Sequence, residues 1–212
     1  ETDTGTLTDA GYTLAVNGNA TFVSGMTLLA TGTVQMNSGG TLTGGGRALF
    51  NVGSTGGTLV FGDDFTIAGV LSDSATLNWN GKTLTLSGAG KTHAISTATL
   101  SNTTGGKLIV TGAGTAITWP GTAGASTDIP NLDLRADVSF DRAAANICVI
   151  NGPGSPRSDF SISAGVTLTL GSNLTLNFNS PTGFSPIFTA NVICNGSTAT
   201  TEPAPAVKIG EK

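Results

Sequence analysis

The amino-acid sequence predicts an all-β protein built as an elongated parallel β-solenoid, or β-helix. The first observation is a Thr-Leu pair that recurs along the chain. A β-branched polar residue beside a large apolar one is typical of a strand whose side chains point alternately outward and inward. Gly or Asn lies near almost every pair and provides places to turn. The pairs begin at Thr6, Thr13, Thr27, Thr41, Thr58, Thr76, Thr83, Thr99 and Thr167.

Composition is the second observation. The 212 residues include 31 glycines, and charged residues make up only 10%, against about a quarter in ordinary globular proteins. A hydrophobic content of 38% with a net charge of −4 favours an ordered fold, because disorder accompanies low hydrophobicity and high net charge. Thr, Gly, Asn and Val dominate while Glu and Lys are scarce, so long helices are not expected.

In the first part of the chain, short apolar and β-branched runs alternate with glycine-rich turns. Asn80-Gly81 is the strongest hairpin signal among these turns. The other turns are centred on Asn17-Gly18-Asn19, Gly39-Gly40, Gly44-Gly45-Gly46 and Gly56-Gly57. The expected strands are 12–16, 26–30, 33–36, 48–52, 58–61, 65–71, 75–79 and 83–86.

The second part continues the pattern with one interruption. Region 120–160 contains Pro120, Pro130, Pro153 and Pro156 and is expected to be an irregular, loop-rich insert within a single domain, residues 1–197. Residues 198–212 are small, polar and proline-containing, which predicts an extended C-terminal tail. The expected strands are 98–100, 107–111, 116–119, 132–134, 147–150, 160–162, 166–170, 174–178 and 187–194.

The spacing of the Thr-Leu pairs favours a solenoid over the alternative, a β-sandwich of the jelly-roll type. Successive intervals from Thr6 to Thr13, Thr27 and Thr41 are 7, 14 and 14 residues, and later ones drift to 17 or 18. Such a loose repeat fits coils whose turns vary in length. A sandwich remains open because it also uses many short strands.

Two stretches, residues 74–88 and 166–178, resemble coils of extracellular β-helical surface proteins. Both carry Leu-x-Leu rungs closed by Gly, such as Leu84-Thr85-Leu86 before Gly88. Autotransporter passengers, filamentous-haemagglutinin-like adhesins and phage tail-fibre shafts have similar rungs. The resemblance implies an extracellular, cell-surface or virion-surface location and a stiff, fibrous role. It carries over no catalytic residue.

These features predict a non-enzymatic structural protein, a subunit of a self-associating surface filament, sheath or fibre, without cofactor or metal. Its expected partners are copies of itself, because uncapped solenoid ends expose strand edges that can pair. The expected contacts involve residues 1–16 and 187–212, with Thr6, Leu7, Val207 and Ile209 in the associating strands. Deleting residues 203–212 is expected to weaken polymerisation.

Two other functions stay open. One is an adhesin or viral receptor-binding fibre that recognises surface glycans through Trp79, Trp119 and the 120–160 loop, with Tyr12 as a third aromatic residue considered for stacking on sugars. The other is a β-helical polysaccharide lyase or hydrolase that uses Asp133, Asp137 and Asp141, because paired carboxylates can act as acid and base. Asp63-Asp64 and the same three carboxylates are also considered as calcium ligands, although a solvated charged surface is the plainer interpretation.

The remaining chemistry-bearing residues indicate no site. His93, the single histidine, is expected to be an exposed turn residue. Gly88-Ala89-Gly90-Lys91-Thr92 resembles the end of a phosphate-binding loop, but a strand-like run follows where a helix is needed.

Cys148 and Cys194 lie in apolar runs, where a disulfide and two buried thiols are both open. The nine Lys and Arg residues are too dispersed for nucleic acid, and no apolar run is long enough for a membrane helix.

Overall fold

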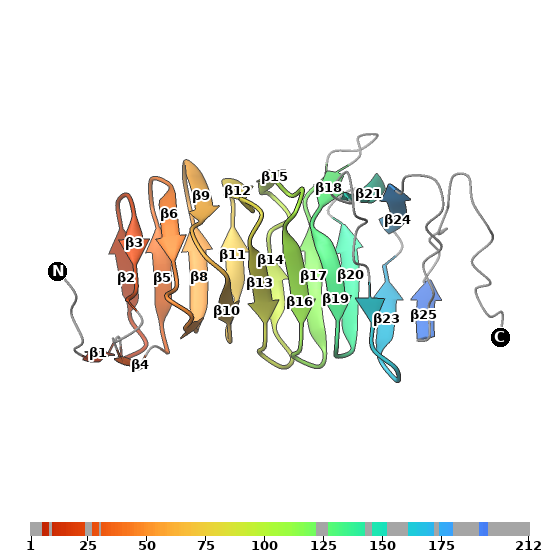
Figure 1. Cartoon of the computed structure of the whole chain (residues 1–212), viewed down its shortest axis with the longest axis horizontal. Coiled ribbons are helices and arrows are strands. Elements are labelled where there is room, and N and C mark those ends of the chain that lie inside the picture. The colour runs from red at the N-terminus through yellow and green to blue at the C-terminus, as the bar shows by residue number, and fades with distance from the viewer. Residues whose placement is uncertain are drawn as a thin grey trace.

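The computed structural model shows an all-β parallel solenoid, as the sequence predicts. It describes residues 6–8, 10–23, 27–29, 31–121, 127–142, 146–151, 161–171, 174–179 and 191–194. All strand pairs in these ranges are parallel. The strands stack along the long axis of the molecule, from the N-terminal ones in red to the C-terminal ones in blue (Figure 1).

One nine-stranded sheet, here called the long sheet, runs through the solenoid. Each coil contributes one strand to it, so its neighbours lie about 4.8 Å apart although they are separated in sequence. Its strands are β2 (Thr13–Val16), β5 (Thr33–Met36), β8 (Asn51–Ser54), β11 (Leu71–Asp73), β14 (Thr92–Ala94), β17 (Thr115–Trp119), β20 (Val138–Arg142), β23 (Thr167–Leu170) and β25 (Asn191–Cys194).

The remaining strands form the other sides of the coils. A six-stranded sheet contains β7 (Ala48–Leu49), β10 (Phe65–Ile67), β13 (Thr83–Leu86), β16 (Lys107–Val110), β19 (Asn131–Leu134) and β22 (Ser161–Ile162). A five-stranded sheet contains β3 (Ala20–Thr21), β6 (Gly40–Thr43), β9 (Thr58–Phe61), β12 (Thr76–Asn78) and β15 (Thr99–Ser101). Two smaller sheets join β1 (Thr6–Thr8) to β4 (Thr27–Leu29), and β18 (Thr127–Ile129) to β21 (Asn146–Asn151) and β24 (Leu174–Asn179).

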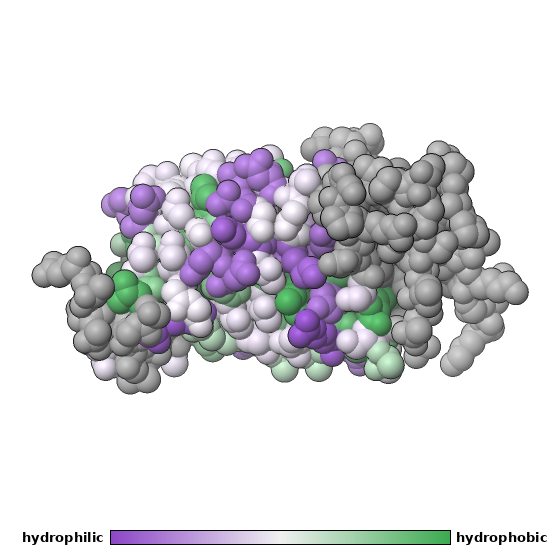
Figure 2. Space-filling view, viewed as in Figure 1, coloured by the Kyte–Doolittle hydropathy of each residue, from purple (hydrophilic) through white to green (hydrophobic). Residues whose placement is uncertain are grey.

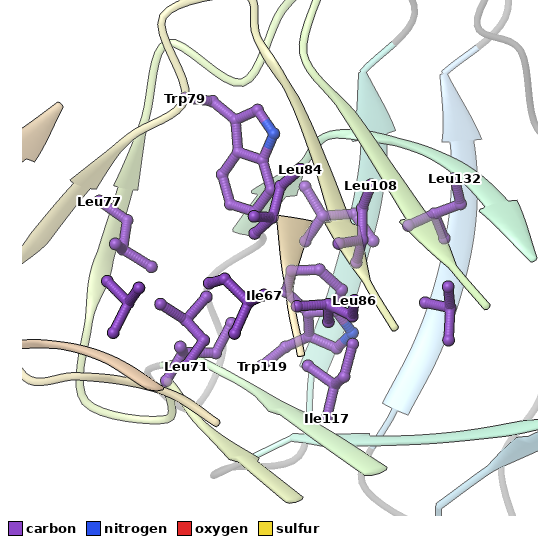
Figure 3. Packing of buried hydrophobic residues seen from close by; sticks show 14 of the residues in the cluster. Ile67, Leu71, Leu77, Trp79, Leu84, Leu86, Leu108, Ile117, Trp119 and Leu132 are labelled. Atoms are coloured by element: carbon purple, nitrogen blue, oxygen red, sulfur yellow. The ribbon is translucent and has the colours of Figure 1, made fainter. Parts of the chain in front are cut away.

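Alternation of Thr and Leu places the core inside the coils. In β13, Leu84 and Leu86 are buried while Thr83 and Thr85 are half-buried on the outer side. Leu84 pairs in register with Leu108 of the next coil, and Leu108 pairs with Leu132, so that leucines form a row through the interior (Figure 3). On the outside, the face in Figure 2 is mostly hydrophilic or intermediate, with few apolar residues.

Coil length differs from the interval read from the sequence. The 14-residue steps between Thr13, Thr27 and Thr41 join strands of different sheets, β2, β4 and β6. The true repeat is longer and variable, since Thr33 pairs with Asn51, 18 residues on, and Val138 pairs with Leu168, 30 residues on.

The expectation of a hairpin at Asn80-Gly81 is wrong. Both residues have positive φ, 51° and 67°, as the dipeptide favours. They turn the chain at a corner between β12 and β13, which belong to different sheets. The dipeptide therefore determined the local turn but not what the following strand pairs with.

The described part of segment 120–160 contains more strands than the two expected there. β19 and β21 match the expected strands 132–134 and 147–150, whereas β18 and β20 were not expected, and all four pair in parallel with neighbouring coils. Pro120 and Pro130 lie between strands and are buried there, where a missing N–H costs no ladder hydrogen bond. Pro153 and Pro156 lie outside the described residues.

Candidate functional site

The carboxylates of Asp63 and Asp64 accept hydrogen bonds from backbone N–H groups. Asp63 accepts hydrogen bonds from the N–H groups of Gly44 and Gly45 at 2.7 Å each, one on each carboxylate oxygen. Asp64 accepts one from Thr83 N–H at 2.7 Å. Corners break the ladder and leave amides unpaired, so these side chains complete the hydrogen bonding there. Their arrangement fits a structural role and provides no open carboxylate pair.

Replacing Asp63 by Ala is expected to lower the free energy of unfolding by about 1–3 kcal/mol, because two part-buried amides lose their acceptor. Asp63→Asn, which keeps one acceptor oxygen, is expected to cost less. Urea denaturation of the three proteins measures the difference. Millimolar calcium is expected to leave the melting temperature unchanged, and a rise of several degrees that is lost in Asp63→Ala would contradict this assignment.

The acids between 133 and 141 do not converge on one point. Asp133 accepts from Arg135 at 2.6 Å and from Ser161 Oγ at 3.0 Å. Asp137 accepts from Thr167 N–H at 2.7 Å, and Asp141 from Arg142 N–H at 2.8 Å. Each carboxylate thus has its own neighbour, and no single strand face carries all three because β19 ends at Leu134.

The charge environment of Asp133 also fits a surface ion pair. Burial raises its pKa, but hydrogen bonds from Arg135 and Ser161, together with the charges of Arg135 and Lys107, outweigh burial and bring the pKa below its usual value. A general acid needs a raised pKa at neutral pH. This geometry therefore favours an ionised, salt-bridged surface carboxylate.

His93 is buried, which corrects the expectation of an exposed turn residue. It is the central residue of β14, and its side chain is 1% exposed. Its Nδ1 accepts a hydrogen bond from Leu71 N–H at 3.0 Å, while its Nε2 is buried without a partner. Burial lowers its pKa from 6.5 to about 4. Gly88-Ala89-Gly90 before it is a turn that leads into this strand, as expected.

Both tryptophans belong to the core. Trp79 and Trp119 are 1% and 0% exposed. Trp79 packs edge-to-face on Phe61 with 5.2 Å between the ring centroids, and Trp119 packs in the same way on Phe140 with 5.6 Å between them. Their ring faces are therefore not available to a sugar. Tyr12 differs, because it is 77% exposed.

Sequence reasoning missed two buried charged residues. Asp73 and Arg142 are each 2% exposed. Arg142 Nε donates a hydrogen bond to the Pro120 carbonyl at 2.9 Å, and its guanidinium also donates one to Thr127 Oγ1. Arg142 therefore binds the chain at Pro120 and at Thr127. Strand alternation was the usable signal, because each lies two residues after an inward apolar side chain, Leu71 or Phe140.

The N-terminal edge of the long sheet exposes an inward-facing residue. Leu14 of β2 pairs in register with Val34, and Val34 with Val52. Val34 and Val52 are buried, whereas Leu14 is 38% exposed. Among the described strands, β2 has a neighbour on one side only, β5.

The residues named for self-association and for a disulfide fall partly inside and partly outside the described ranges. Thr6 and Leu7 are in β1, which pairs with β4. Val207 and Ile209 lie outside the described residues. The backbone places Cys148 in β21 and Cys194 in β25, strands of different sheets, but their side chains are outside the description, so the disulfide stays a prediction.

The described ranges contain neither a metal-binding cluster nor a membrane-spanning helix. In them, no three or more His, Cys, Asp or Glu residues gather closely enough to hold a metal ion. The same ranges contain no helix long and apolar enough to cross a membrane. Comparison with protein-family models, curated proteins and solved structures gives no match.

Proposed function

We propose that this chain is a non-enzymatic structural protein of a cell or virion surface, a subunit that associates with copies of itself into a filament, sheath or fibre. The observation that carries the proposal is the edge strand β2. Its Leu14 is in register with the buried Val34 of the next coil but is itself open to solvent. A strand of a second copy that pairs with β2 would extend the ladder and cover this residue.

Backbone and side chains both favour pairing at this edge. An edge strand presents unpaired N–H and C=O groups that can template another chain. Leu14 adds apolar area whose burial stabilises the contact by roughly 25 cal/mol per Å². Tyr12, which immediately precedes β2, supplies a second large exposed side chain.

The sequence around β2 lacks the usual protection against pairing. Natural edge strands are blunted by charged residues, proline or bulges. Residues 10–23 contain neither a charged residue nor a proline. A chain with a net charge of only −4 also repels its copies weakly. These features support like-to-like association over a solitary role.

Leu14→Asp is expected to weaken self-association at least about tenfold, because a carboxylate at the joint would have to be desolvated without a partner. Its effect on folding is expected to be small, since Leu14 is already 38% exposed. Analytical ultracentrifugation over a concentration series, with negative-stain microscopy, measures the change. Ser72→Asp is the matched control, because Ser72 is exposed on the outer face of the same sheet, in β11.

Three results are informative. Association weakened by Leu14→Asp and not by Ser72→Asp supports the β2 joint. Association equally weakened by both variants points to lateral contacts through the outer face instead. A wild-type chain that stays monomeric at millimolar concentration would contradict self-association altogether.

A further inference from the structure

His93 interrupts an otherwise apolar row. On the inward side of the long sheet, register places Val52 beside Leu71, His93 beside Ile117, and Ile117 beside Phe140. His93 joins the two halves of this row through the Leu71 N–H hydrogen bond. An aliphatic residue would pack here at no electrostatic cost, so an imidazole at this point introduces a pH sensitivity that the other rungs lack.

The imidazole also serves as an acceptor in the strand ladder. One coil earlier, Val52 N–H donates to the carbonyl of Val70 at 2.9 Å. At the corresponding position one coil later, Leu71 N–H donates to His93 Nδ1 at 3.0 Å. Because Nδ1 accepts, the neutral ring carries its proton on Nε2, which is buried and has no partner.

Pairing is sparse at this seam. β11 and β14 share one register pair, Ser72 with Ala94. On either side, β8 with β11 and β14 with β17 each share three. The bond from Leu71 to His93 therefore adds a contact where β11 and β14 share a single register pair.

Few charged groups face His93. In β11, the neighbouring strand on one side, Asp73 is the inward-facing ionisable residue. In β17, the neighbouring strand on the other side, no residue is ionisable. Lys91 lies just before β14, and its Nζ is 5.5 Å from the centre of the Phe50 ring. The pKa of Asp73 is raised by burial, which hydrogen bonds from Ala75, Ser54 and Ser74 offset only in part. Asp73 therefore takes up a proton more readily folded than unfolded and partly opposes the acid effect of His93.

We infer that the β11–β14 seam is an acid-sensitive latch: protonation of His93 at Nδ1 breaks the bond from Leu71 and opens this side of the solenoid. A proton on Nδ1 would face the Leu71 N–H, leaving two donors opposed and an imidazolium in the apolar row. Opening lets water reach the ring and exposes two strand edges in the middle of the long sheet.

The direction with pH follows from linkage. His93 has a pKa of about 4 in the closed state and about 6.5 when open to water. The closed state thus keeps its full stability above pH 6.5 and loses it progressively as the pH falls toward 4. Between pH 7 and 4.5 the opening equilibrium is expected to rise about 50-fold.

Amide hydrogen exchange of the full chain tests this inference, with exchange at Leu71 and Ala94 compared with that at Leu108 in β16. His93→Asn is the matched variant, because its Oδ1 can accept from Leu71 N–H and does not titrate. After correction for the intrinsic pH dependence of exchange, we expect the 50-fold rise in the wild type at the seam alone, and a nearly flat profile in His93→Asn. Asp73→Asn is expected to enlarge the rise slightly.

NMR titration of the single imidazole provides a readout without any variant. We expect the neutral ring to carry its proton on Nε2 at pH 7 and to protonate well below 6.5. Titration near 6.5 in the folded protein, or the same acid-dependent exchange in His93→Asn, would overturn the latch.

Discussion

Trp79→Ala is expected to lower the free energy of unfolding by about 3–5 kcal/mol, the usual cost of removing a buried Trp. Trp79 is 1% exposed, packs edge-to-face on Phe61 at 5.2 Å, and donates from Nε1 to the Lys107 carbonyl at 3.3 Å. The substitution removes the ring and leaves a cavity that the neighbouring coils can fill only by shifting. Urea denaturation followed by circular dichroism measures the loss.

Close packing of the next coil against Trp79 limits how far neighbouring residues can move into the cavity left by the substitution. A Cβ added at Gly106 would overlap the Trp79 ring, so the backbone of the next coil lies directly on the indole. Tyr12→Ala is the matched control, because Tyr12 is 77% exposed and its removal is expected to change stability by less than about 0.5 kcal/mol. A loss below about 1 kcal/mol for Trp79→Ala would show that this part of the core is loosely packed.

Gly40→Ala is expected to lower the free energy of unfolding by about 3 kcal/mol or more. Gly40 begins β6 with a φ of 129°, a conformation that side chains rarely adopt. A Cβ there would also overlap the carbonyl of Gly18, at the same corner of the preceding coil. Both terms act together because the backbone cannot relax away from a stacked neighbour.

Gly46→Ala separates the cost of the unfavourable φ from the cost of the steric overlap. Gly46 also has positive φ, 73°, but a Cβ there would meet nothing within 4 Å. Its substitution is expected to cost only the conformational strain, about 1–2 kcal/mol. Thermal and urea unfolding of both variants measure the difference. Equal losses would show that the corner at Gly40 can shift, and that close stacking of glycines does not limit the coil geometry.

Local sequence determined the strands and the side each residue faces. The Leu residues of Thr83-Leu84-Thr85-Leu86 are buried and the Thr residues are not, as alternation requires. Asn80-Gly81 turned the chain where expected. Abundant short strands, glycine corners and low charge were sufficient for the all-β class and favoured a solenoid, because each of these depends on residues close together in the chain. The parallel pairing that separates a solenoid from a sandwich came from the structure.

Only the tertiary structure decided which residues meet. Coils of variable length bring Val52 beside Leu71, and Leu71 beside His93, so the surroundings of His93 depend on how many residues each corner uses. The same dependence hid the partners of Asp63 and the overlap at Gly40. A one-residue change in coil length would turn inward residues outward, and no local pattern records that length. The sequence therefore determined the short strands and the alternation of their side chains. The stacking of the coils decided which side chains of neighbouring coils contact one another.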